Sequence, residues 1–158
     1  MAINFEFFRL PSSIASIATI SLLVLLFIAA GFDVIQRRIP NALIITGVVI
    51  AAAFASLAGF SGIGKMAAGL LAALVVLLPV YASGLMGAGD VKLISLVGSF
   101  LGLHHFLFAL LCIFAAGGLL AVFFMLRDRK FVHAAGLPYG VAILSGVAGY
   151  SPFFIAAH

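Results

Sequence analysis

Two of the four acidic residues stand next to long apolar runs, where a carboxylate could do chemistry. Asp33 directly follows the run Ile14–Phe32, and Asp90 lies between Gly87-Ala88-Gly89 and the apolar stretch Leu93–Val97. An ionisable side chain near hydrocarbon is costly unless it is paired or hydrated, so its presence there indicates a function. Two carboxylates in one site share a proton, because both cannot ionise easily. The ionised one can accept a proton from an attacking water while the protonated one polarises a carbonyl oxygen, which is the chemistry of peptide hydrolysis.

The spacing of these residues also allows two other interpretations. Asp90 could be the N-cap of the helix that follows it, since an N-cap carboxylate accepts hydrogen bonds from free backbone N–H groups. Alternatively, both aspartates could relay protons or bind cations in a small transporter, as intramembrane acids often do. Gly87 and Gly89 fit the hydrolytic interpretation, because without a Cβ their backbone can take left-handed angles and let a substrate strand come close.

Composition predicts the elements that must position the two aspartates. Of the 158 residues, 66% are hydrophobic and 8% are charged, whereas about 25% of a soluble domain is charged. Lipid must therefore surround most of the protein, and we expect an all-α, polytopic membrane protein that forms one domain over residues 1–158. The net charge of +4 is better explained by Lys and Arg in cytoplasmic loops than by nucleic-acid binding. The single Cys112 excludes an intrachain disulfide or a multi-cysteine zinc site.

Apolar runs separated by charge, Gly and Pro predict a bundle of about six transmembrane helices. They are Ile14–Phe32, Ala42–Leu57, Met66–Ser83, Val91–Leu101, His105–Leu126 and Pro138–Ala156. Five of the eight Lys and Arg residues fall in the connections after the first and fifth runs, and Lys92 stands at the start of the fourth run, beside the connection after the third. The positive-inside rule places these connections in the cytoplasm. Both aspartates are then expected at the cytoplasmic end of the bundle, at the same depth.

Three segments, in this order along the chain, resemble motifs of one protein family. They are Asp33-Val34-Ile35-Gln36-Arg37-Arg38-Ile39-Pro40-Asn41, Gly87-Ala88-Gly89-Asp90-Val91-Lys92-Leu93 and Pro138-Tyr139-Gly140. They are similar to GxGD-type intramembrane aspartic proteases and, within that group, to the type IV prepilin peptidase family. The resemblance implies that Asp33 and Asp90 form the catalytic pair. Gly87, Gly89 and Lys92 would shape the site or bind substrate, and no metal or organic cofactor is expected.

The same resemblance implies a substrate and a location. The substrate would be a prepilin or pseudopilin, with a short basic leader followed by an apolar helix. Cleavage would take place at the cytoplasmic face of the bacterial inner membrane and support the assembly of a pilus or secretion system. Larger members of the family carry paired CxxC motifs, which one cysteine cannot form. The chain is therefore similar to the short branch that serves Flp pili of tight-adherence systems, and methyltransferase activity is not expected.

Overall fold

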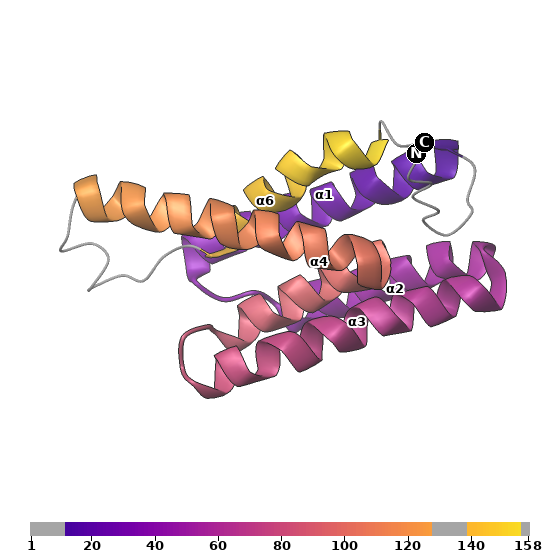
Figure 1. Ribbon diagram of the computed structural model, residues 1–158, viewed down its shortest axis with the longest axis horizontal. Coiled ribbons are helices and arrows are strands. Elements are labelled where there is room, and N and C mark those ends of the chain that lie inside the picture. Colours follow the sequence, from indigo (N-terminus) through magenta and orange to yellow (C-terminus); the bar gives the residue numbers. More distant parts are fainter. Residues whose placement is uncertain (1–11, 128–138, 156–158) are drawn as a thin grey trace.

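The protein is helical in the parts of the chain that its structure, a computed structural model, describes. These parts are residues 12–127 and 139–155. Short turns join the helices within the first part (Figure 1), and the elements are α1 (Ser12–Gln36), α2 (Asn41–Leu57), α3 (Gly59–Ala82), α4 (Ala88–Arg127) and α6 (Tyr139–Ile155). The predicted all-α class is confirmed for these residues. Pro138 and the last residues of the expected final span lie outside them.

Three of the helices are long and apolar enough to cross a membrane, so the predicted number of six is not confirmed. The three are α1, α3 and α4, whereas α2 and α6 are shorter apolar helices. α3 begins at Gly59, seven residues before the predicted Met66. The predicted fourth and fifth spans both belong to α4, which combines two helical segments across a local break.

This break lies at Gly102, which has φ 67° and ψ 173°. These angles are accessible almost only to glycine, because a Cβ atom would clash with the backbone. Figure 1 shows that α4 reverses its direction here. We call residues 88–101 the first arm and residues 103–127 the second arm. The two arms correspond to the two apolar runs that were predicted as separate spans.

The first arm is the most enclosed segment of the bundle. From Val91 onward its apolar side chains are buried, and four of them, Leu93, Ile94, Leu96 and Val97, are 0% exposed. An arm of this length rises only about 20 Å, which is less than the roughly 30 Å of a hydrocarbon core. Such a short segment is tolerated at membrane depth because protein surrounds it.

Glycines bring α3 and the first arm into backbone contact. A Cβ atom added to Gly98 would lie 2.5 Å from the carbonyl oxygen of Gly69, and one added to Gly69 would lie 2.8 Å from the Cα of Gly102. Both distances are shorter than a real Cβ contact, so only glycine permits this approach. Small residues at a helix crossing are typical of membrane bundles. The crossing fixes the first arm, and hence Asp90 at its start, relative to α3.

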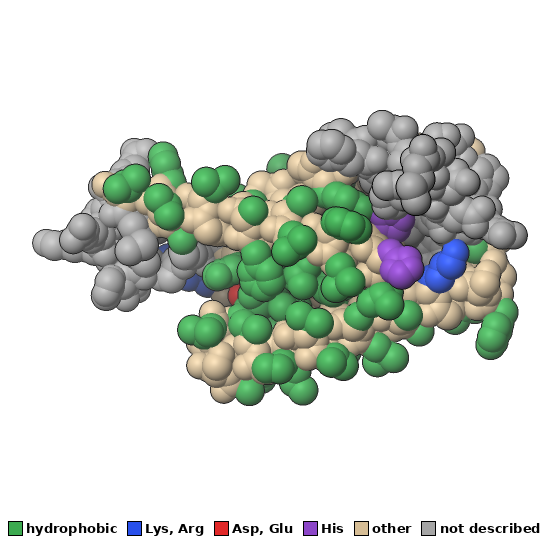
Figure 2. Space-filling model, viewed as in Figure 1, with side chains coloured by type: hydrophobic (Ala, Val, Ile, Leu, Met, Phe, Trp, Pro, Cys, Tyr) green, Lys and Arg blue, Asp and Glu red, His purple; other side chains and the backbone are tan. Residues whose placement is uncertain are grey.

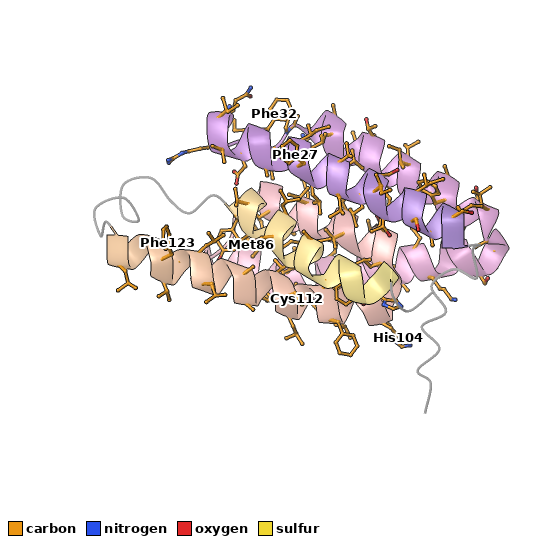
Figure 3. All side chains as sticks on the ribbon, turned by 90° about the horizontal axis from the view of Figure 1, so that it is seen from above. Phe27, Phe32, Met86, His104, Cys112 and Phe123 are labelled. Atoms are coloured by element: carbon orange, nitrogen blue, oxygen red, sulfur yellow. The ribbon has the colours of Figure 1, made fainter. Side chains whose placement is uncertain are left out.

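The connections α1–α2 and α3–α4 lie at the same end of the bundle, where α6 also begins (Figure 1). In Figure 3, Met86 and Phe123 lie toward this end, and His104 lies toward the opposite end. Asp33 and Asp90 therefore share one end of the molecule, as the alternation of apolar runs predicted. The assignment of that end to the cytoplasm stays a prediction.

Candidate active site

Asp33 lies in the last turn of α1 and is half-buried. The predicted first span ended at Phe32, just before Asp33, but the helix continues to Gln36. Arg37 then adopts a left-handed conformation with φ 52°, and its N–H donates to the carbonyl oxygen of Asp33 at 3.0 Å. A left-handed residue with this hydrogen bond is a common way for a helix to end. The chain thus leaves α1 one turn after Asp33 and directs its carboxylate into the bundle end.

Asp90 is the third residue of α4 and is also half-buried. Its carboxylate accepts a hydrogen bond from the backbone N–H of Gly87, the residue before the helix. A carboxylate at this third position that reaches back to the capping residue forms one half of a capping box. The interpretation of Asp90 as the N-cap itself is therefore wrong, because Gly87 holds that position. Asp90 nevertheless contributes to the start of the helix.

The two carboxylates are close enough for the charge of Asp33 to act on Asp90. They are the only acids among the described residues, since Glu6 and Asp128 lie outside the described ranges. Figure 2 shows an acidic side chain in a recess at the α1 and α4 end, with basic side chains beside it. The structure thus brings together the pair that the sequence singled out, and it does so from two helices far apart along the chain.

Two contacts join the segment after α1 to the start of α4. The Nζ of Lys92 donates a hydrogen bond to Oδ1 of Asn41 at 2.9 Å. A Cβ added to Gly89 would lie 3.5 Å from Ile39, an ordinary van der Waals distance. The sequence named Lys92 as site-shaping but could not find its partner. Lys92 fixes the start of α4 against the start of α2, beside the two aspartates.

Gly87 and Gly89 do not adopt the left-handed angles that glycine permits. Among the described glycines, positive φ angles occur at Gly59, Gly84 and Gly102. Gly89 lies inside α4, where a regular helical conformation needs no glycine. The turn before α4 takes its left-handed residue three positions earlier than Gly87, at Gly84 (φ 77°), because the chain must reverse directly after α3.

Gly140 also belongs to the candidate site, although it has no side chain from which the sequence could predict such a role. Its backbone N–H donates to Oδ2 of Asp33 at 2.8 Å, and it stands in the first turn of α6. The sequence identified this glycine only as part of a segment at the start of the last span. A backbone donor leaves no signal in residue type or spacing, so only the packing of α6 against α1 shows it.

Comparison with protein families decides the identity of this helical bundle. Residues 20–126 match the type IV leader peptidase family, and this range includes both aspartates and more than half of the chain. The chain belongs to the type IV leader peptidase family. Comparisons with curated proteins and with solved structures found no match. Membership of this peptidase family and three membrane-length helices together indicate a membrane protein with a leader peptidase-like function.

Proposed function

We propose that this family member is an aspartic endopeptidase in which Asp33 and Asp90 are the catalytic residues. The observation that carries the proposal is that these two half-buried carboxylates lie at one end of the bundle, near enough for the negative charge of Asp33 to act on Asp90. Two carboxylates that share one proton can act together as a base and an acid. Each also accepts a backbone N–H, from Gly140 and from Gly87, and these bonds restrict how the carboxylates turn.

The hydrolytic step follows from this pair. The ionised carboxylate takes a proton from water as the water oxygen bonds to the scissile carbonyl carbon, and the protonated carboxylate donates to the carbonyl oxygen. The resulting tetrahedral species breaks its C–N bond: the departing amine takes a proton from the protonated carboxylate, while one hydroxyl of the tetrahedral species gives its proton to the other carboxylate and becomes the new carbonyl oxygen. One water is consumed, and the pair again shares a single proton. Because the proton belongs to both groups, the apparent titration belongs to the pair.

The substrate that fits this site is a type IV prepilin of the Flp type. Its apolar helix can lie among the membrane-spanning helices, which places the junction with its basic leader at the depth of the aspartates. The basic connections at this end favour the cytoplasmic face of the bacterial inner membrane. Cleavage there would support pilus or secretion-system assembly. The single cysteine supports a peptidase without methyltransferase activity.

Co-expression with a Flp-type prepilin tests the proposal. The wild type should convert the prepilin to its shorter form, and Asp33→Asn and Asp90→Asn should each slow this conversion by at least about 100-fold, because each removes half of an acid–base pair. Asp128→Asn, which changes the acid expected in a loop, is the control and should process normally. Normal processing by either dyad variant would refute the aspartic mechanism. Ion movement in liposomes without any processing would instead favour the transporter interpretation.

A further inference from the structure

We propose that Gly140 is a positioning residue for Asp33, through its backbone N–H and through its lack of a side chain. This inference rests on the proposed function, because it concerns the orientation of the same catalytic pair. It assigns α6, which carries neither aspartate, a direct part in the site.

The N–H of Gly140 is available to Asp33 because of its place in α6. The helix begins at Tyr139, so this N–H belongs to the first turn, whose donors have no partner within the helix. Oδ2 of Asp33 lies 2.8 Å away and accepts it. The positive end of the helix dipole also favours a carboxylate at this point. The bond holds Oδ2 and leaves Oδ1 as the oxygen that can meet water.

The missing side chain of Gly140 is equally important. A Cβ atom at this position would lie 3.0 Å from both the Cβ and the Oδ2 of Asp33, and 3.2 Å from the Cα of Ala30. Carbon atoms in ordinary contact stay about 3.5–4.0 Å apart. The Cβ of Asp33 and the Cα of Ala30 are both fixed to the backbone of α1, so α6 must shift away from α1 by a few tenths of an ångström. Such a shift lengthens the hydrogen bond from the Gly140 N–H and releases the carboxylate of Asp33 from its position.

Two alanine substitutions in α6 test this role. Gly140→Ala should lower kcat about tenfold or more while leaving KM within about twofold, because a displaced catalytic group impairs the chemical step and not binding. Gly149→Ala is the control in the same helix, since its Cβ would meet nothing within 4 Å. It should keep the wild-type kcat per folded molecule. If Gly140→Ala keeps kcat as Gly149→Ala does, the inference is wrong.

The hydrogen bond itself can be observed without changing Gly140. Tyr139-Gly140 is the only Tyr-Gly step of the chain and Met86-Gly87 the only Met-Gly step. Pairing a ¹³C-carbonyl Tyr or Met label with ¹⁵N-Gly therefore isolates one amide in each case. Asp33→Ala should move the Gly140 amide proton upfield by more than the Gly87 amide proton. An unchanged Gly140 signal would overturn the assignment.

Asp90→Ala provides the reciprocal control for this measurement. It should move the Gly87 amide proton by more than the Gly140 amide proton, since each aspartate has its own backbone donor. Failure of the proposed function remains separate from failure of this inference. In the first case the Asp→Asn variants still cut the prepilin. In the second they do not, while Gly140→Ala keeps the wild-type kcat.

Discussion

Replacing Gly102 with alanine should lower the free energy of unfolding by about 1–3 kcal/mol. The reason is the backbone at the reversal of α4, where φ 67° and ψ 173° lie in a region that only glycine enters without strain. Crowding adds little, because the nearest atom to a new Cβ would be the carbonyl oxygen of Lys65 at 3.5 Å. The cost is therefore conformational, and serine at this position should cost a similar amount.

Gly118→Ala is the matched control, because it changes the same residue type in the second arm. Its Cβ would meet nothing within 4 Å, and alanine stabilises a regular helix by about 0.5–1 kcal/mol relative to glycine. The two variants should thus differ by about 1.5–4 kcal/mol. Equilibrium unfolding in mixed micelles, followed by circular dichroism, measures the difference. A Gly102→Ala protein as stable as the Gly118→Ala protein would show that the break in α4 does not lie at residue 102.

Two other hydrogen bonds give predictions of different kinds. The first is a double-mutant cycle of Lys92→Met and Asn41→Leu, in which processing of the prepilin should fall in each single variant and no further in the double variant. The expected coupling energy is about 0.5–1.5 kcal/mol. Additive losses would show that the 2.9 Å hydrogen bond between these side chains has no part in the site. Tyr150→Phe should cost about 1–3 kcal/mol of stability, because it removes the hydroxyl that lies 2.6 Å from Nδ1 of the buried His105. Processing per folded molecule should stay unchanged, since this pair joins α6 to the part of α4 that lies away from the aspartates. Tyr81→Phe, at a side chain that is 47% exposed, should leave stability within about 0.5 kcal/mol, and an equal loss in both variants would contradict the assignment.

Much of the helical arrangement follows from the sequence, because hydropathy depends on composition along the chain. The ends of the helices were harder to predict. Residues 59–65 contain three glycines, a serine and a lysine and were interpreted as a loop, yet they form the start of α3. A Cβ at Gly62 would lie 2.7 Å from the Cβ of Ala58. This close approach at the turn from α2 stabilises a helix that local propensity opposes.

Of the candidate site, the sequence predicted the residues whose side chains can do chemistry, but not the contacts between them. Asp33 and Asp90 were found because an acid beside an apolar run is unusual. The partner of Lys92 and the donor on Gly140 were not found, because both contacts depend on the rotation and packing of helices. For a related reason, the sequence could not show that Gly87 and Gly89 leave the left-handed angles open to them unused. Residue type shows which conformations glycine permits but not which one the turn requires.

The bond between Gly140 and Asp33 has a consequence for biosynthesis. The two residues are 107 positions apart, and a ribosome adds about 5–20 residues per second. Asp33 is therefore made about 5–20 s before its backbone donor. Throughout that interval α1 has no α6 to pack against, and once Asp90 has been added the nascent chain holds both aspartates without the complete arrangement around them. A protein truncated before α6 would carry the whole dyad and still lack its final constraint.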